Sequence, residues 1–144
     1  MHEDRDSSRQ SVFPFLRYAN AADAIVWLEK AFGFQPEMVV PGDDGSIAHA
    51  QLRFGASVVM LGSVKDRDPL GLSARGALAG SSQGIYLVVD DAEAAYAQAV
   101  DAGAEVVMEL TRTDYGSEDF SVRDPEGHLW SFGTYHPDDD ASAG

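Results

Sequence analysis

The stretch Asp119-Phe120-Ser121-Val122-Arg123-Asp124-Pro125-Glu126-Gly127-His128-Leu129-Trp130-Ser131-Phe132-Gly133-Thr134-Tyr135 decides the fold of this chain. Its pattern indicates two strands joined by a tight turn, because proline fixes φ at one turn position and glycine tolerates a positive φ at another. In the second strand, alternation separates the small residues from the large aromatic ones. The aromatic face needs a helix or a second sheet to cover it, and the other face is free to line a cavity. The first face carries Trp130, Phe132 and Thr134, and the second carries Leu129, Ser131 and Gly133.

The N-terminal half predicts a strand, a helix and three further strands. Residues 12–18 are rich in β-forming side chains, and Asn20 with Asp23 has the spacing of a capped helix start. Apolar residues then recur at helical spacing as far as Gly33, which we expect to end the helix in the left-handed conformation. The three strands are expected over residues 37–40, 47–54 and 57–61.

The same order recurs in the C-terminal half. Residues 85–89 predict a strand, Asp90 with Glu93 a capping box, and Gly103 the end of a second helix. Residues 105–110 predict the next strand, and the stretch quoted above supplies the last two. The residue numbers of Gly103 and Gly33 differ by 70, as do those of Asp90 and Asn20. Such a constant spacing indicates a duplicated unit.

These patterns predict an α+β protein made of two tandem βαβββ modules. A sheet of four strands does not bury both faces alone, so we expect the modules to pack together as an open, cup-shaped mixed barrel with the helices outside. The interior of such a cup is a usual place for a small ligand. The expected boundaries are a flexible tail at 1–10, a first module at 11–62, a linker at 63–83, a second module at 84–135 and a flexible acidic tail at 136–144.

Composition narrows the possible partners. The chain has 144 residues and a net charge of −14, and such a charge repels nucleic acid. The electrostatic field of this negative charge would draw cationic ligands inward. The alternative is that the acidic residues serve only to keep the protein soluble. No apolar run is long enough to span a bilayer, and cysteine is absent. We therefore expect a cytoplasmic protein with no membrane or nucleic-acid partner.

The features together resemble the vicinal oxygen chelate superfamily, which includes glyoxalase I, the bleomycin-resistance proteins, fosfomycin-resistance enzymes and extradiol dioxygenases. The resemblance covers residues 12–135. It rests on the paired βαβββ pattern, on both helix caps, on Ala31-Phe32-Gly33-Phe34 and on Asp124-Pro125-Glu126-Gly127-His128-Leu129-Trp130. It implies the fold expected above and a homodimer, because paired units in this superfamily often complete their sheets with a second subunit.

The resemblance also implies positions for metal ligands, on the first strand of each module and late in each sheet. In this chain those positions hold Phe13, Gly84, Gln51 and Ser131. Phenylalanine and glycine offer no donor, and a catalytic zinc needs about three protein ligands. A site built from His49 and Gln51 would still lack a third ligand. We therefore expect no metal and no other cofactor.

Strand alternation brings aromatic and polar residues of both modules into the cup. The aromatic rings could stack on a planar ligand, and His49 and Gln51 could form hydrogen bonds with it. The alternative is that Phe13, Phe15 and Met60 fill a small barrel core. The candidate ligand-binding residues are Phe13, Phe15, His49, Gln51, Met60, Tyr86, Tyr115 and Ser131.

The sequence thus predicts a metal-free protein that sequesters a planar or cationic small molecule, as the bleomycin-resistance branch does. The alternative is a lyase or oxidoreductase of the glyoxalase I or dioxygenase kind with a degenerate metal site. We assign no catalytic residue, although His49 with Tyr86 or Arg17 could perform acid–base chemistry. Four other residues are assigned structural roles: Trp27 and Trp130 to the core, His128 to a solvated turn, and Arg123 to an ion pair with Asp119.

Overall fold

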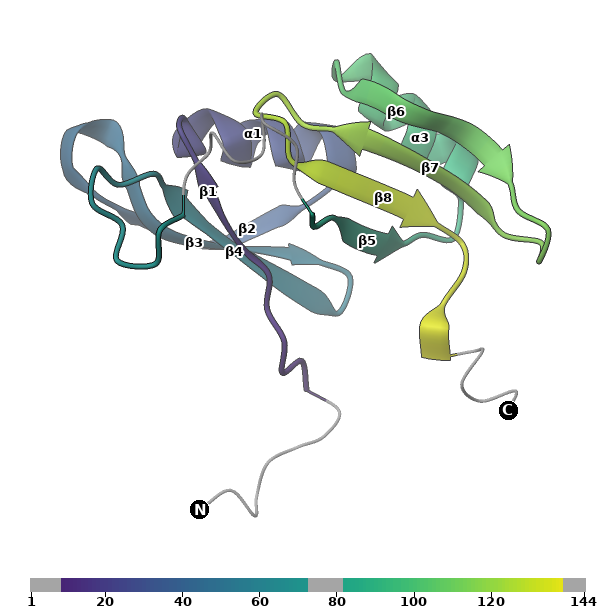
Figure 1. Cartoon of the computed structure of the whole chain (residues 1–144), viewed down its shortest axis with the longest axis horizontal. Helices are drawn as coiled ribbons and strands as arrows, with labels where there is room; N and C mark the ends of the chain where they lie inside the picture. The colour runs from purple at the N-terminus through teal and green to yellow at the C-terminus, as the bar shows by residue number, and fades with distance from the viewer. Residues whose placement is uncertain (1–8, 73–81, 139–144) are drawn as a thin grey trace, which may run out of the picture.

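The computed structural model describes residues 9–72 and 82–138 and shows two consecutive units with the same order of elements (Figure 1). The middle of the expected linker and most of both expected tails lie outside the described residues. Among the described residues, no helix is long and apolar enough to cross a membrane. The first unit contains β1 (Phe15–Tyr18), α1 (Ala21–Phe32), β2 (Gln35–Pro41), β3 (Ile47–Phe54) and β4 (Ser57–Ser63), with a short 3-10 turn, η1 (Asp43–Gly45), between β2 and β3. The second unit contains β5 (Ile85–Val88), α3 (Ala92–Asp101), β6 (Glu105–Arg112), β7 (Glu118–Arg123) and β8 (Leu129–Gly133).

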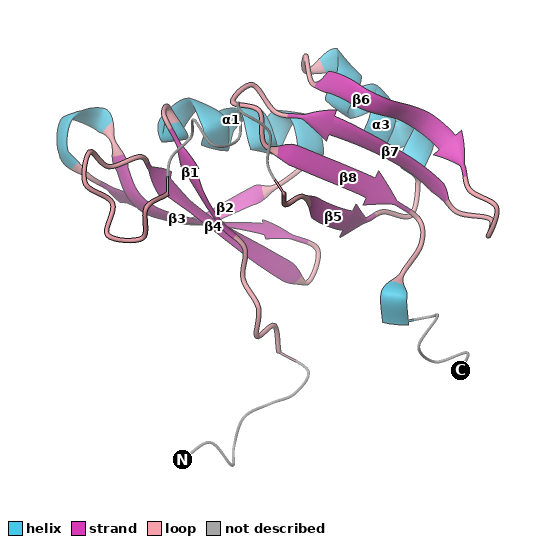
Figure 2. Ribbon diagram, viewed as in Figure 1, coloured by secondary structure: helices cyan, strands magenta, loops and turns pink. Residues whose placement is uncertain are grey.

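Each unit forms one four-stranded mixed sheet, and the two sheets share a topology. The strand order is β1-β4-β3-β2 in the first sheet and β5-β8-β7-β6 in the second. In both, the first strand runs parallel to the last, and the other pairs are antiparallel. Figure 2 shows the sheets next to each other, and the contacts place α1 against the first sheet, α3 against the second sheet, and the two helices against each other. The prediction of an α+β chain with tandem βαβββ modules is confirmed.

The first helix begins and ends where the sequence predicts. Asn20 Oδ1 accepts the backbone N–H of Asp23 at 3.4 Å, and Asn20 Nδ2 donates to the Asp23 carboxylate at 2.8 Å. Gly33 follows the helix with φ of 82°, a conformation that costs glycine little. Both ends of α1 are therefore set by local residues.

The second helix begins one residue later than predicted. Its cap is Asp91, whose Oδ1 accepts the Ala94 N–H at 3.0 Å, and not Asp90. Either aspartate offers the same capping group, so the local sequence does not distinguish them. In the helix that starts from Asp91, Ala92 and Ala99 are both 0% exposed, so these small residues of α3 face the interior.

One hydrophobic core joins the two units. The Phe32 ring at the end of α1 lies 5.4 Å from the Trp130 ring and 4.9 Å from the Phe132 ring, centroid to centroid. Trp130 and Phe132 are 0% and 1% exposed, so the aromatic face of β8 is covered by the helix of the other unit. Trp27 is partly buried, packs edge-on against Phe32 and donates its indole N–H to the Ala102 carbonyl at 2.8 Å. The assignment of both tryptophans to packing is confirmed.

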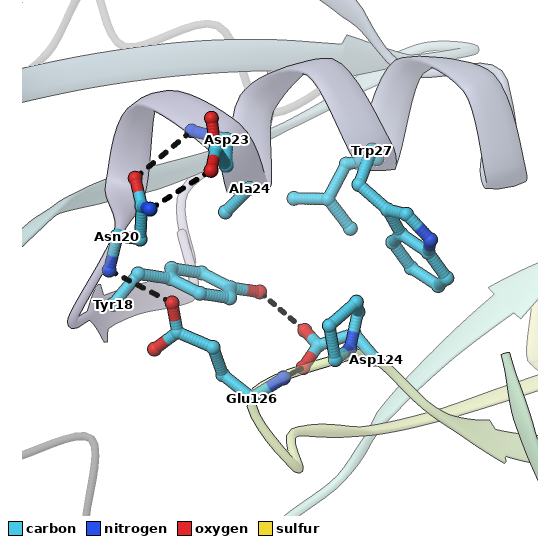
Figure 3. A pocket seen from close by; sticks show the side chains of 9 residues that line it. Tyr18, Asn20, Asp23, Ala24, Trp27, Asp124 and Glu126 are labelled. Atoms are coloured by element: carbon cyan, nitrogen blue, oxygen red, sulfur yellow. Dashed lines mark hydrogen bonds between the residues drawn. The ribbon is translucent and has the colours of Figure 1, made fainter. Parts of the chain in front are cut away.

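The carboxylate of Asp124 ties the units together through four hydrogen bonds. The residue is 4% exposed. Its Oδ1 accepts the N–H groups of Glu126 and His128, both at 3.0 Å, as expected of a turn aspartate. Its Oδ2 accepts the Tyr18 hydroxyl at 2.6 Å (Figure 3) and the Trp130 indole N–H at 3.0 Å. Because Tyr18 ends β1 and Trp130 belongs to β8, one buried group holds the first sheet against the second.

Two other turn residues also contact the first unit. The Glu126 carboxylate accepts the backbone N–H groups of Ala19 at 2.6 Å and Asn20 at 2.8 Å. His128 is partly buried, with Nε2 3.0 Å from the Arg17 carbonyl oxygen and its ring 4.6 Å from that of Tyr18. The prediction of a solvated His128 is wrong, because the turn packs against the end of β1.

We expect Asp124→Ala to lower the free energy of unfolding by about 3–5 kcal/mol, because four donors lose their acceptor in a buried position. Tyr18→Phe removes one of these bonds and should cost about 1–2 kcal/mol. Urea unfolding followed by circular dichroism measures both, with exposed Asp66→Ala as the control. A cost for Asp124→Ala no larger than that of the control would contradict this role.

Stability should also depend on pH through Tyr18. Burial, followed by the charge and hydrogen bond of Asp124 and then Glu126, raises the pKa of Tyr18 well above 10.0. The unfolded chain releases this proton near pH 10, whereas the folded chain keeps it. The contribution is therefore complete below about pH 10 and is lost as pH rises toward the folded pKa.

Above pH 10, the wild type should lose up to about 1.4 kcal/mol per pH unit more than Tyr18→Phe does. Urea unfolding of both proteins between pH 9 and 11 measures this difference. Parallel pH profiles would show that Tyr18 is not shielded as described.

Candidate functional site

The sheet faces that point away from the helices carry most of the candidate residues. Strand pairing aligns Phe15 of β1, Met60 of β4, Gln51 of β3 and Met38 of β2 as one row across the first sheet. Phe15 is 47% exposed and Met38 is 46% exposed, whereas Leu61, next to Met60, is 2% exposed toward α1. The sheet therefore has one core face and one open face that carries this row, which we call the first row.

The second sheet has an equivalent row at the same place. Pairing aligns Tyr86 of β5, Ser131 of β8, Ser121 of β7 and Met108 of β6. Each lies 70 or 71 residues after its counterpart in the first row. The two serine hydroxyl oxygens lie 2.7 Å apart. This second row thus has small polar groups at its centre and a large side chain at each end, and the duplication extends to the candidate site.

Three candidates lie outside the rows. His49 Nε2 lies 3.0 Å from Gln51 Oε1, two residues along β3, so His49 joins the open face beside the first row. Phe13 precedes β1 and is 38% exposed. Tyr115 lies in the turn between β6 and β7, 68% exposed, with its ring 5.6 Å from that of Tyr135. The Tyr135 carbonyl accepts the Tyr86 hydroxyl at 2.7 Å, which connects this turn to the second row.

The open faces are not filled as a core within one chain. Phe13, Phe15 and Tyr86 are 38%, 47% and 40% exposed. All seven residues of β2 are exposed as well. In the single chain, Phe13 and Phe15 are therefore not packed inside a closed barrel.

Sequence reasoning missed Met38 and Met108, which end the two rows. Their residue numbers differ by 70, the spacing already seen between the helix ends, so the repeat could have revealed the pair. Alternation along the strands could not, because the pairing register shifts between Pro36 and Met38 and again on both sides of Met108.

The arginines near these faces are bonded to protein groups. Arg17 pairs with Asp68 at 2.7 Å, and Arg53 pairs with Glu37 at 2.5 Å. Arg123, expected to pair with Asp119, instead donates to the Gly127 carbonyl at 3.1 Å. The two residues lie at opposite ends of β7, where Arg123 is next to the turn. These contacts leave the arginines engaged rather than arranged as an anion clamp.

The phenol of Tyr86 is held as a neutral donor. Partial burial, and then the nearby Asp119 carboxylate, raise the pKa of Tyr86 above its ordinary value. The Asp119 carboxylate itself accepts the Ser117 hydroxyl at 2.6 Å. The second row therefore offers a planar ring with a fixed hydroxyl at its end.

The donors on these faces do not suit a catalytic metal. The first row offers one amide oxygen and two thioethers, and the second offers hydroxyls and one thioether. The implied positions Phe13 and Gly84 carry no donor. Across residues 9–72 and 82–138, no group of three His, Cys, Asp or Glu side chains could hold a metal ion. Catalytic zinc needs about three such ligands, so we derive no reaction step through a metal.

Gly133 allows Tyr86 to occupy its position. A Cβ at this residue would lie 2.5 Å from the Tyr86 hydroxyl oxygen and would also collide with the Asp119 carboxylate. We expect Gly133→Ala to displace the phenol, break its bond to Tyr135 and lower the Tyr86 pKa toward its ordinary value. An NMR titration of ring-labelled tyrosine measures this pKa, with Tyr86→Phe identifying the signal. An unchanged Tyr86 titration in Gly133→Ala would show that the contact is not as described.

Comparisons with known proteins agree with this architecture. A family model described as Glyoxalase/Bleomycin resistance protein/Dioxygenase superfamily matches residues 12–132. An uncharacterized protein of Mycobacterium bovis, Mb0911c, is 38% identical over 121 residues, which are 83% of this chain and 80% of the relative.

Solved structures show the same fold. The crystal structure of TioX from Micromonospora sp. ML1 has a TM-score of 0.68 and 29% identity, covering 88% of this chain and 100% of that one. The Arabidopsis thaliana gene product AT5G48480 has a TM-score of 0.66 and 27% identity, covering 85% and 97%. Because the family model spans most of the sequence, the chain belongs to the glyoxalase/bleomycin resistance protein/dioxygenase superfamily.

Proposed function

We propose that this chain is a metal-free binding protein that sequesters a planar or cationic small molecule on the open faces of its sheets. The observation that carries the proposal is the pair of equivalent rows, each with an aromatic ring at one end and at least one polar side chain at its centre. Exposed apolar surface rimmed by polar groups marks binding sites on otherwise soluble proteins. The family also includes bleomycin-resistance proteins by its description, which fits sequestration.

The side chains of the rows suggest the chemistry of the ligand. Phe15 and Tyr86 present rings that can stack on a planar molecule. Gln51 with His49, and Ser131, which is bonded to the buried Ser121, supply hydrogen-bonding groups next to those rings. The net charge of −14 favours a cationic ligand over an anionic one. A planar cation therefore matches both the rows and the field of the protein.

A second copy of the chain is the partner that we propose for the open faces. Met38, Val39 and Val40 are 43–46% exposed on β2, an edge strand, and exposed apolar edge strands favour pairing or covering by another chain. A homodimer that covers these faces would enclose the ligand between chains. We expect sedimentation to show a dimer for the wild type and a folded monomer for Val40→Asp.

The matched control for the dimer is Val26→Asp, because Val26 is 66% exposed on α1, away from the open faces. This variant should remain dimeric. A monomeric wild type, or a Val40→Asp variant as dimeric as the control, would oppose the homodimer.

Binding itself is tested by calorimetry with planar cationic aromatics such as bleomycin, ethidium and acridine orange. We expect Phe15→Ala and Tyr86→Ala each to weaken binding roughly tenfold, the size of one lost stacking contact. Val26→Ala, a truncation of an exposed apolar residue elsewhere, should leave affinity unchanged. Absence of binding across the panel, or equal affinities in all variants, would argue against the proposal.

The alternative is a lyase or oxidoreductase of the glyoxalase I or dioxygenase kind with a degenerate metal site. The hydrogen bond between His49 and Gln51 is the observation that favours it. In that case, elemental analysis of protein purified without chelator should find a stoichiometric divalent metal that His49→Ala loses. Such a result would replace the binding proposal.

A further inference from the structure

A pocket lies on the helix side of the molecule, away from both rows. It has a volume of about 300 Å³ and lies between the first two turns of α1 and the turn that follows β7. Figure 3 shows Ala24 and Trp27 of α1 on one side, and Asp124 and Glu126 on the other. Leu28 and Pro125 complete the apolar wall. The proposed binding function on the sheet faces uses none of these residues.

The charge around this pocket has one sign. Asp23, Asp124 and Glu126 line it, and no lysine, arginine or histidine is among its lining residues. Asp124 is buried and bonded on both oxygens, so Asp23, which is exposed, and Glu126, which is half-buried, are the carboxylates that a ligand can reach. Each Glu126 oxygen accepts one backbone N–H, which leaves a further acceptor position on each.

The start of α1 would ordinarily favour an anion here. In this chain, the protein's own groups take three of the backbone donors at this end of the helix. Glu126 accepts the N–H groups of Ala19 and Asn20, and Asn20 accepts that of Asp23. An added anion would meet three carboxylates without a free donor from these residues, whereas a cation would be attracted.

The wall adds a preference for an organic cation over a metal ion. The indole of Trp27 lines the pocket, and tryptophan is the side chain that attracts cations best through its ring face. Trp27 is fixed in place by its bond to Ala102 and its contact with Phe32. A volume of 300 Å³ accommodates roughly ten non-hydrogen atoms, since a water molecule occupies about 30 Å³ in the liquid.

We propose that this pocket binds a small organic cation, a quaternary or protonated amine whose apolar groups lie against Trp27 and whose charge is directed toward Asp23 and Glu126. The site is separate from the open sheet faces and does not depend on the function proposed for them. Both can be occupied in the same molecule.

The test uses NMR of the full-length, ¹⁵N-labelled protein. The chain has two tryptophans, so two indole N–H signals report on Trp27 and Trp130, and Trp27→Phe assigns them. Choline is the cationic probe, and 3,3-dimethylbutan-1-ol is its neutral counterpart of the same shape. We expect choline to shift the Trp27 signal saturably and more than that of Trp130, with an affinity roughly tenfold higher than that of the neutral alcohol.

Variants locate the site. Asp23→Asn should weaken choline binding roughly fivefold by removing one charge, and Ala24→Met should abolish it by filling the pocket. Glu29→Gln removes a charge elsewhere on α1 and should have no effect, and neither should Phe15→Ala on the open sheet face. Should Ala24→Met fail to fold, Asp23→Asn and the neutral probe still decide the matter.

Three results would overturn the proposal. The first is the lack of a saturable shift at Trp27. The second is equal affinity for choline and the neutral alcohol, which would mean an uncharged apolar crevice. The third is binding that Asp23→Asn leaves unchanged or that Phe15→Ala abolishes, which would place the cation elsewhere.

Discussion

The buried carboxylate of Asp124 is the constraint on which the structure depends. It receives two donors from its own turn, one from β8, which follows that turn, and one from β1 in the other unit. A carboxylate only accepts hydrogen bonds, and four donors occupy its four favoured positions. Leaving such donors unpaired inside a protein is costly, so the end of β1 cannot move independently of β8.

Because Asp124 holds the two units together, the two faces of the sheets have different surroundings. With the units held together, Phe32 of α1 covers Trp130 and Phe132, and the helix side becomes one continuous core. The opposite faces have no such cover within the chain, and their aromatic and thioether side chains remain exposed. The apolar surface available for binding thus follows from how the core is built.

Much of this arrangement can be predicted from local sequence. The caps Asn20 and Gly33 and the alternation of Trp130 and Ser131 depend on neighbours in the chain and were predicted correctly. The duplicated unit was also predicted correctly, from the constant spacing of residue numbers between the two halves. The bond between Tyr18 and Asp124 could not be predicted, because it joins residues 106 positions apart. The pocket beside Trp27 depends on the same long-range approach. Met38 and Met108 were missed for a different reason, because register shifts in β2 and β6 break the alternation on which face assignments rest.

We infer that the two units form one cooperative structure because Asp124 couples them. Native-state hydrogen exchange tests it most directly, because it reports the free energy of opening for each strand separately. We expect the slowest amides of β3 and β4 and those of β7 and β8 to exchange with the same free energy in the wild type, and the values to separate in Asp124→Ala. Different opening free energies for the two sheets in the wild type would contradict it.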